Sequence, residues 1–489
     1  MKYLLYTLFA FTLFSCRSVD NDESATTVDQ PIALHPQNPH YFIYKGKTLG
    51  LITSAEHYGA VLNLDFDYKT YLNTLATEGM NYTRVFTGSY FENPGDFGIK
   101  HNTLAPASGR VITPWVKNEE GKYDLSSFND DYFVRIKDFL RIAQEKGIIV
   151  EITLFSSIYQ DKNWEIVPQN PANNINITED ITRFEAQTIN NKSLMGFQKA
   201  FVAKMVSELN EFDNIFFEIQ NEPWSDHNVP VYNIVNKDEL KENDWQNKAD
   251  LASDEVLEWH KVIAKAITAT ESSLKKKHLI AQNYVNYRAS IPEVDSNISI
   301  INFHYAWPEA AEWNYHYDKV IGSDESGFAG TTDQVYRRQA WQFMLSGGGL
   351  FNSLDYSFFV GKEDGTGENI GPGGGSPTLR SQLKTLSTFL HSFELEKLKP
   401  TKALVKKAPG LISYALSDGE KATAVYLRST GTKRSTLELQ MKDGDYEIQY
   451  LNTLSDEYLP KTNAKSENGI VTIPVNIPDG EIALKIVRD

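Results

Sequence analysis

The stretch Ile215-Phe216-Phe217-Glu218-Ile219-Gln220-Asn221-Glu222-Pro223-Trp224 is a short, mainly apolar run that ends in a carboxylate. Its length and its β-branched and aromatic residues predict a buried strand. Pro223 has no backbone N–H to donate to a sheet, so the strand does not simply continue beyond Glu222. The sequence thus places a carboxylate at the end of a buried strand.

Similar runs alternate with longer amphipathic segments from about residue 40 to residue 393. The other predicted strands are Leu49–Glu56, Tyr82–Thr87, Ile148–Ser156, Leu279–Val285, Ile298–Ala306, Val320–Asp324 and Gly349–Asp355, with Ile215–Gln220 the fourth of the eight. Apolar residues at helical spacing predict helices between them. These helices are Asn129–Lys146, Leu194–Leu209, Ala252–Thr270, Gln334–Leu345 and Thr378–His391.

Eight strands with intervening helices predict an α/β fold, a (β/α)8 TIM barrel, over residues 39–395. A doubly wound open sheet is the alternative, and it should carry a glycine-rich phosphate turn after its first strand. Here the first strand runs into Ser54-Ala55-Glu56-His57-Tyr58, which contains no glycine. The barrel is therefore the favoured fold.

Three long connections follow predicted strands of the barrel. Gly88–Phe128 and Ser157–Lys192 are polar segments dotted with aromatic residues, and Val360–Ser376 is rich in glycine. Connections of this length in a compact domain are usually functional or disordered. The first two lie on the strand-to-helix side, where a TIM barrel keeps its active site, and they favour a closed pocket or a short cleft. The third lacks the Gly-Lys-Ser/Thr ending of a phosphate loop.

Residues 396–489 have a different pattern, in which apolar and polar residues alternate between turns of Gly, Asp, Asn and Pro. This alternation predicts a small antiparallel β-sandwich. We expect it to pack against the barrel, and a carbohydrate-binding role is the alternative. The predicted strands are Ile412–Leu416, Thr423–Ser429, Thr436–Met441, Tyr446–Leu451, Ile470–Val475 and Ile482–Val487.

The predicted seventh strand supplies a second carboxylate. Val320-Ile321-Gly322-Ser323-Asp324-Glu325-Ser326-Gly327 ends in two adjacent acidic residues. Successive side chains of a strand point to opposite faces, so only one of the two should face the barrel interior. We expect this to be Glu325 and expect Asp324 to face elsewhere, toward the helix layer.

These two strand ends resemble those of the clan A superfamily of retaining glycoside hydrolases. Members end the fourth strand in Asn-Glu-Pro, which Asn221, Glu222 and Pro223 match, and commonly carry Glu with Gly two residues later on the seventh, as Glu325 and Gly327 do. The resemblance implies that Glu222 is the general acid/base, that Glu325 is the nucleophile, and that Asn221 binds the sugar 2-hydroxyl. A chance tripeptide is the alternative for the fourth strand.

Other strand ends carry candidate substrate-binding residues, several of which the resemblance suggests. Superfamily members often have an Arg near the nucleophile and a His and a Tyr after the sixth strand, but there the His and Tyr are one residue apart and here they are adjacent. The usual Trp of the eighth strand is absent, and Tyr356 and Phe358 are the aromatic residues nearby. The candidates are Glu56, His57, Arg84, Asn283, His304, Tyr305, Trp224 and Trp307. For Glu56 and His57 a structural ion pair is the alternative, and each Trp is as readily a packing residue.

The first 16 residues resemble the export signal of a bacterial lipoprotein. Lys2 precedes the apolar run Tyr3–Phe14, which is shorter than a membrane span, and the run ends at Cys16, the single cysteine of the chain. We expect a signal over residues 1–16 with lipidation at Cys16, then a flexible tether over 17–38. An ordinary cleaved signal is the alternative. The chain would be an exported lipoprotein on the periplasmic face or the outer-membrane surface of a Gram-negative bacterium, like the cellulase-like lipoproteins of Bacteroidetes.

Composition excludes several other classes of protein. Of 489 residues, 48 are Lys or Arg and 64 are Asp or Glu, which gives a formal charge of −16 and no basic cluster for nucleic acid. The ten His residues lack zinc-site spacing, and no Gly-x-Ser-x-Gly motif is present. We expect no cofactor, no metal, a carbohydrate substrate, a monomer, and membrane attachment only through lipid.

The sequence therefore predicts a retaining β-glycosidase that uses two Glu residues on a polysaccharide or oligosaccharide. A carbohydrate-binding surface lipoprotein on a non-catalytic barrel is one alternative. An inverting or lyase-type barrel is another, and for inversion the carboxylates would be about 6.5–9.5 Å apart rather than about 5–5.5 Å.

Overall fold

The computed structural model describes residues 30–232 and 248–489. The predicted export signal, the lipidation candidate Cys16 and the predicted tether up to residue 29 lie outside the described residues. The last part of that tether belongs to the fold, because β1 (Ala33–Leu34) pairs with β2 (Phe42–Tyr44) and Ile32 is fully buried.

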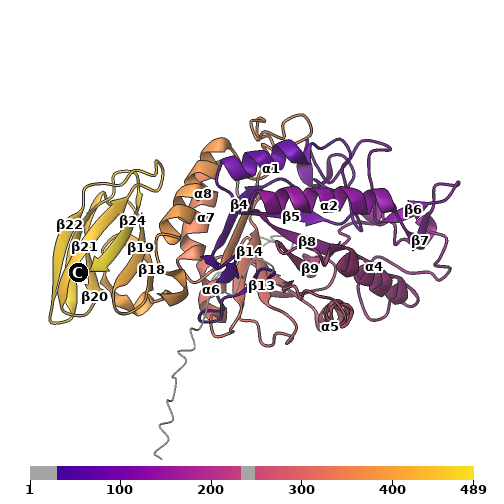
Figure 1. The fold of residues 1–489 in the computed structure, drawn as a ribbon. Coiled ribbons are helices and arrows are strands. Elements are labelled where there is room, and N and C mark those ends of the chain that lie inside the picture. Colours follow the sequence, from indigo (N-terminus) through magenta and orange to yellow (C-terminus); the bar gives the residue numbers. More distant parts are fainter. Residues whose placement is uncertain (1–29, 233–247) are drawn as a thin grey trace, which may run out of the picture.

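Eight parallel strands form the barrel, and each coincides with a predicted strand (Figure 1). Their side chains are buried along their whole length, as expected for strands covered on both faces. Adjacent strands follow the order β4-β15-β14-β13-β12-β9-β8-β5. The strands are β4 (Leu51–Ala55), β5 (Tyr82–Phe86), β8 (Ile149–Ser156), β9 (Ile215–Asn221), β12 (Ile280–Asn286), β13 (Ile300–His304), β14 (Val320–Glu325) and β15 (Leu350–Leu354). The TIM-barrel prediction is confirmed.

The seam between the first and last strands in this order, β4 and β5, is joined through a side chain rather than a ladder of backbone hydrogen bonds. The Asn81 amide donates to the carbonyl oxygen of Gly50 at 2.9 Å, and its oxygen accepts from the Ile52 N–H at 2.8 Å. Below the barrel, β2 and β3 (Lys47–Leu49) contribute to an apolar cluster with the first residues of the barrel strands. The amino-terminal end of the barrel is therefore sealed, and a site is available only at the other end.

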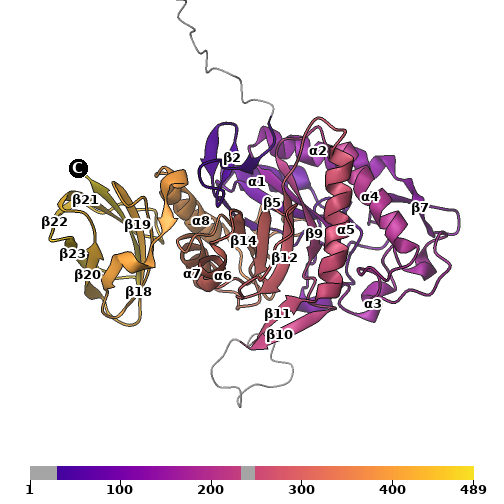
Figure 2. The same cartoon turned by 90° about the horizontal axis from the view of Figure 1, so that it is seen from below.

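The helices surround the barrel (Figure 2). The five predicted helices are confirmed as α2 (Asp130–Glu145), α4 (Leu194–Leu209), α5 (Asp254–Glu271), α7 (Asp333–Met344) and α8 (Pro377–Leu390). The prediction missed α1 (Tyr68–Thr77), α6 (Pro308–Asn314) and the single turn α3 (Asp161–Trp164). The sequence did contain an N-cap residue for α1, Asp67, whose side chain accepts hydrogen bonds from the N–H groups of Lys69 and Thr70. In the described parts of the chain, no helix has the length and apolar character needed to cross a membrane.

The C-terminal strands form one nine-stranded antiparallel sheet. Strands from its two halves face one shared apolar core, so the sheet folds over on itself, in keeping with the predicted sandwich. It docks on the barrel through the stacked rings of Trp341 and Tyr426, and Glu481 pairs with Arg337 at 2.7 Å. Its strands are β16 (Lys399–Pro400), β17 (Val405–Lys407), β18 (Leu411–Ser417), β19 (Ala422–Ser429), β20 (Arg434–Gln440), β21 (Gly444–Leu451), β22 (Thr462–Glu467), β23 (Ile470–Asn476) and β24 (Glu481–Arg488).

Three shorter pairings decorate the barrel. A hairpin of β10 (Asn228–Tyr232) and β11 (Lys248–Ala252) follows β9, and β11 pairs with β12 at one position. In the long connection after β5, β6 (Trp115–Lys117) pairs with β7 (Tyr123–Phe128). The long connections therefore carry secondary structure of their own.

Candidate active site

Glu222 and Glu325 come together at the carboxyl-terminal end of the barrel. Glu325 is the last residue of β14, and Glu222 directly follows β9 with a left-handed φ of +48°. One carboxylate oxygen of Glu222 and one of Glu325 lie within 4.8 Å of each other. The Tyr305 hydroxyl lies between them, 2.7 Å from Glu325 Oε1 and 3.3 Å from Glu222 Oε1.

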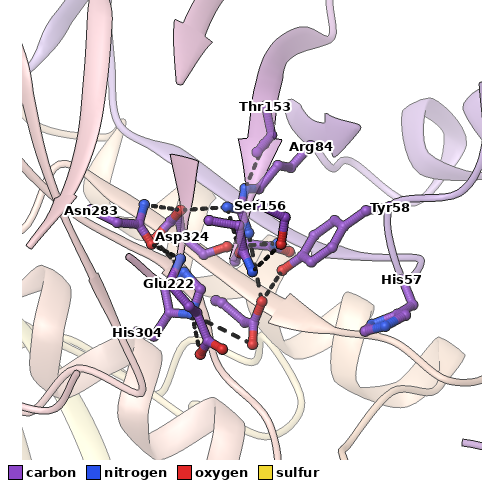
Figure 3. Close-up of polar contacts among 12 residues, drawn as sticks. His57, Tyr58, Arg84, Thr153, Ser156, Glu222, Asn283, His304 and Asp324 are labelled. Carbon is purple, nitrogen blue, oxygen red and sulfur yellow. Dashed lines mark hydrogen bonds and ion pairs between the residues drawn. The ribbon is translucent and has the colours of Figure 1, made fainter. Parts of the chain in front are cut away.

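Asp324 also points into the barrel, and the prediction that it faces the helix layer is wrong. The register between β13 and β14 shifts here, because Phe303 pairs with Ser323 but His304 pairs with Glu325. Asp324 is the extra residue of this irregularity, so the alternation of side chains breaks and both acidic residues face inward. Its carboxylate lies 3.4 Å from Arg84 Nη2, and Asn283 donates to it at 3.2 Å (Figure 3).

Four groups hold Glu325 as a carboxylate. Tyr58 donates to Oε2 at 2.9 Å and Tyr305 donates to Oε1. The cationic groups of His304 and Arg84 each lie 3.5 Å from it. Burial by itself raises the pKa of Glu325, but His304, Arg84 and Tyr305 outweigh burial and lower it to about 2. These contacts therefore favour the ionised form of Glu325.

Glu222 has a different set of neighbours. Its Oε2 accepts from the Tyr159 hydroxyl at 2.8 Å, and its Oε1 lies 2.9 Å from His304 Nδ1. The side chain of Glu222 is 12% exposed, whereas that of Glu325 is 7% exposed. Asn221 supports this arrangement, because its amide donates to Tyr159 at 2.7 Å while its oxygen accepts from Arg84 at 2.8 Å.

A second layer of acidic side chains lies sealed beneath this pair and surrounds Arg84. Glu218 accepts from Arg84 Nε at 2.9 Å and from Thr153 at 2.6 Å, and Glu151 lies 4.0 Å from Arg84. Burial and the neighbouring carboxylates raise the pKa of Glu218 well above its usual value and that of Glu151 to about 8. Arg84 and His304 instead lower the pKa of Asp324 despite its burial. The Arg84 guanidinium thus lies among several carboxylates, with Glu218 at 2.5 Å, Asp324 at 3.4 Å and Glu325 at 3.5 Å.

Among the described residues, two sets of three side chains have the spacing of metal ligands. Glu222, His304 and Glu325 form one set, and the other is the sealed group of Glu151, Glu218 and Asp324. In the sealed group the Arg84 guanidinium already supplies a cation at hydrogen-bonding distance. In the upper set burial lowers the pKa of His304, but Glu325 and Asp324 outweigh burial and raise it well above its usual value.

A pocket opens above the two carboxylates. Aromatic and apolar side chains form most of its wall, with a few polar groups at its base. Such a lining suits a sugar ring, which offers hydroxyl groups at its edge and C–H groups on its faces. The lining residues are His57, Tyr58, Phe86, Glu92, Phe97, Leu104, Tyr159, Asn221, Glu222, Tyr305, Glu325 and Phe328.

His304 and Tyr305 both reach the site although they are adjacent in the sequence. Tyr305 has a left-handed φ of +54°, and its N–H donates to the carbonyl oxygen of Glu325 at 2.7 Å. The chain turns sharply after β13, so the two side chains no longer point to opposite faces. The left-handed backbone at Tyr305 therefore lets both adjacent residues face the site.

Several other predicted residues lie beside the pocket rather than in its lining. Glu56 is fully buried, its carboxylate accepts from the N–H groups of Gly59 and Ala60 at 3.0 Å, and burial raises its pKa to about 7. Trp224 packs edge-on against His304. Asn283 joins Glu218 to Asp324 beneath the pocket. Trp307 is 37% exposed on the rim, with Arg288 stacked on its ring.

The sequence analysis did not single out Tyr58, Tyr159 and Glu92, which all line the pocket. Tyr58 directly follows the predicted Glu56-His57 pair, so its position at a strand end was the available signal. Tyr159 and Glu92 lie in the two long connections, whose polar and aromatic composition indicates a role for the loop but does not identify a residue. Tertiary structure alone brings these side chains to the carboxylates.

No protein-family model matches the chain, and no curated protein matches it. Solved structures do match. A putative glycoside hydrolase from Bacteroides vulgatus ATCC 8482 aligns with a TM-score of 0.64 at 12% identity, covering 94% of this chain and 83% of its own. A glycoside hydrolase family 5 structure from the same organism gives 0.60 at 11% identity, covering 94% and 93%. A third structure, described as a glycoside hydrolase, gives 0.56 at 12% identity, covering 94% and 97%.

These neighbours agree with the resemblance that the sequence showed to clan A glycoside hydrolases. The alignments cover nearly the whole chain, so they include the C-terminal sheet as well as the barrel. At such low identities the likeness establishes the shared fold, and the chemistry has to be argued from the residues of this chain.

Proposed function

We propose that the chain is a retaining β-glycosidase that hydrolyses a polysaccharide or oligosaccharide by double displacement. The observation that carries the proposal is the pair Glu222 and Glu325, whose oxygens approach within 4.8 Å in one pocket. Retaining enzymes hold their two carboxyl groups about 5–5.5 Å apart, and inverting enzymes leave about 6.5–9.5 Å for a water molecule. The spacing here supports retention.

The surroundings of the two residues support different roles for them. Glu325 is held ionised by Arg84 and His304, which suits a nucleophile. Glu222 accepts a hydrogen bond from Tyr159 and is the more exposed of the two, which suits a group that exchanges a proton with the leaving group and with water.

In the first step a Glu325 oxygen attacks the anomeric carbon as the glycosidic C–O bond breaks. Glu222 gives its proton to the departing oxygen and becomes a carboxylate. In the second step Glu222 takes a proton from water, the water oxygen bonds to the anomeric carbon, and the bond to Glu325 breaks. Two inversions give net retention, and both side chains return to their starting states.

The test is a panel of β-linked polysaccharides and aryl β-glycosides, followed by proton NMR of the first product formed. We expect hydrolysis with the β-anomer appearing first and mutarotating afterwards. An α-anomer as first product would show inversion and overturn double displacement. Glycan binding without hydrolysis across the panel would instead favour a carbohydrate-binding protein on a non-catalytic barrel.

We also propose that the chain is exported and lipidated at Cys16, as the N-terminal sequence suggests. The test is expression in a Gram-negative host with labelled fatty acid, comparing the full chain with Cys16→Ser. Label and membrane association in the full chain, both lost in Cys16→Ser, are the expected results. Processing without label would indicate an ordinary cleaved signal.

A further inference from the structure

We infer that His57, Glu92 and Tyr356 form a subsite that binds the hydroxyl groups of an uncharged sugar ring beside Glu325. The inference rests on the proposed function and adds the class of sugar to it. The three residues come from separate parts of the chain, which are the end of β4, the connection after β5 and the end of β15.

His57 has unused hydrogen-bonding capacity at the pocket. It lines the pocket and is only 9% exposed, yet neither of its ring nitrogens has a hydrogen-bond partner among the described residues. Figure 3 shows its ring apart from the bonded cluster around Glu222. A buried polar group left without a partner is costly, so a ligand that supplies partners is favoured here.

Glu92 lies next to His57 and faces the same pocket. Its Oε2 is 3.5 Å from His57 Nε2, and its Oε1 accepts from Tyr90 at 3.3 Å. Asn102 donates to Oε2 as well, so both oxygens are held in place from the protein side. A carboxylate has about four acceptor positions, which leaves room on Glu92 for hydroxyl donors from a ligand.

Tyr356 completes the group. Its ring centroid is 5.7 Å from that of His57, and its buried hydroxyl has no hydrogen-bond partner among the described residues. The glycine-rich segment fixes this ring, because a Cβ on Gly371 or Gly373 would come within 2.5 or 2.6 Å of ring atoms of Tyr356. This close backbone approach accounts for a motif that the proposed reaction leaves unexplained.

The charges at the subsite define the class of sugar. Glu92 and Glu325 both face the pocket. Burial lowers the pKa of His57, but Glu92 and Glu325 outweigh burial and raise it; His57 pairs with Glu92 across 3.5 Å, and Arg84 and His304 balance Glu325. Each of these cations therefore already faces a carboxylate of the protein, so the carboxylate of a uronic acid or a sulfate group would find no unpaired positive charge to offset its loss of hydration. A neutral sugar instead offers hydroxyl groups that donate to Glu92 and exchange hydrogen bonds with His57 and Tyr356.

The experiment compares aryl β-glycosides that share one leaving group. The pairs are β-glucoside with β-glucuronide and β-galactoside with β-galacturonide, with β-xyloside and β-mannoside added. We expect kcat/KM for the preferred neutral glycoside to exceed that of its uronide by at least roughly a hundredfold. A uronide hydrolysed as fast as its neutral partner would overturn the inference while leaving the proposed reaction intact.

The variants are Glu92→Gln, His57→Ala and Tyr356→Phe, with Glu120→Gln as the control, an exposed carboxylate in the same connection as Glu92. Losing one hydrogen bond to a charged group should lower kcat/KM roughly tenfold to a hundredfold. Glu92→Gln should also raise the uronide-to-neutral ratio, which a merely structural change would not do. Unchanged kcat/KM and an unchanged ratio in Glu92→Gln would contradict the inference.

A binding measurement covers the case in which no aryl glycoside is cleaved. Calorimetry of the Glu222→Gln variant with neutral β-linked oligosaccharides should show binding that weakens at least roughly tenfold when Glu92→Gln is added. Binding without hydrolysis by the unmodified protein would then contradict the proposed reaction and leave the subsite inference intact. No binding of any neutral oligosaccharide would contradict the subsite inference.

Discussion

The barrel interior holds two layers of carboxylates that differ in access and in charge. Glu222 and Glu325 face a pocket and receive hydrogen bonds from tyrosine hydroxyls. Glu151 and Glu218 lie fully buried one layer below, and burial raises the pKa of each. The pKa of the same type of side chain is therefore raised or lowered according to its full set of charged neighbours and its burial, and not by its distance from Arg84 alone, since Glu218 lies closer to Arg84 than Glu325 does. The upper layer is suited to chemistry, and the lower layer positions the cation that the upper layer needs.

The largest expected effect is on turnover, from changing the upper layer. Glu325→Gln removes the proposed nucleophile while keeping nearly the same shape, so kcat should fall roughly a thousandfold or more. Thermal unfolding monitored by circular dichroism should remain cooperative. Glu218→Gln is the matched control from the lower layer. A turnover loss of the same size in this variant would contradict the proposal that the upper layer alone carries the chemistry.

The next effect is on stability, from removing the cation between the layers. Arg84→Met leaves Asp324 buried without its main partner, which should cost about 3–5 kcal/mol in the free energy of unfolding. It should also raise the pKa of Glu325, so the acid limb of the kcat/KM profile should move to higher pH. Urea titration and a pH–rate profile measure the two effects.

A control for that variant is Arg110→Met, which breaks an exposed pair with Asp65. It should change stability by less than about 1 kcal/mol and leave the pH profile unchanged. Equal losses in the two variants would mean that burial of the Arg84 charge network has little energetic consequence.

A smaller effect is expected from the tyrosine that serves only Glu325. Tyr58→Phe removes a 2.9 Å hydrogen bond to the carboxylate. Because hydrogen bonds to charged groups contribute about 1.5–3 kcal/mol, kcat/KM should fall roughly tenfold to a hundredfold. The acid limb of the kcat/KM profile should also move to higher pH. Tyr132→Phe is the comparison, since its buried hydroxyl lies away from the pocket lining and has no partner among the described residues. It should leave the rate unchanged.

The smallest effect on turnover is expected from a change in the lower layer, whose consequence should appear instead in the pH dependence of stability. The pKa of Glu151 is raised to about 8 in the fold, above its unfolded value near 4.3, so the unfolded state loses its proton first as pH rises. The stability contribution of protonated Glu151 is complete below about pH 4.3 and is lost as pH rises toward 8. Glu151→Gln should reduce this slope, and the part that remains should come from Glu218 and Glu56, whose pKa values burial also raises. An unchanged slope in urea titrations from pH 5 to 9 would place its origin outside Glu151.

The main elements of the fold follow from local patterns. Each barrel strand is a buried apolar run, and each long helix has apolar residues at helical spacing, so both were predictable within a few residues. The short helices α1, α3 and α6 were missed because one to three turns carry little periodicity. The bridge made by Asn81 across the β4–β5 seam joins segments about thirty residues apart, and no local pattern in either segment predicts it.

The candidate site likewise has features that the sequence predicts and features that only the tertiary structure shows. The sequence by itself determined that Glu222 and Glu325 stand at strand ends, since parallel strands bring their carboxyl ends to one edge. Only the tertiary structure decided that Asp324 faces Arg84, because a register shift reverses the alternation of side chains. Only the folded loops bring Glu92 and Tyr159 to the pocket. Strand periodicity is a local property, whereas the irregularities and long connections that complete the site depend on contacts between distant segments.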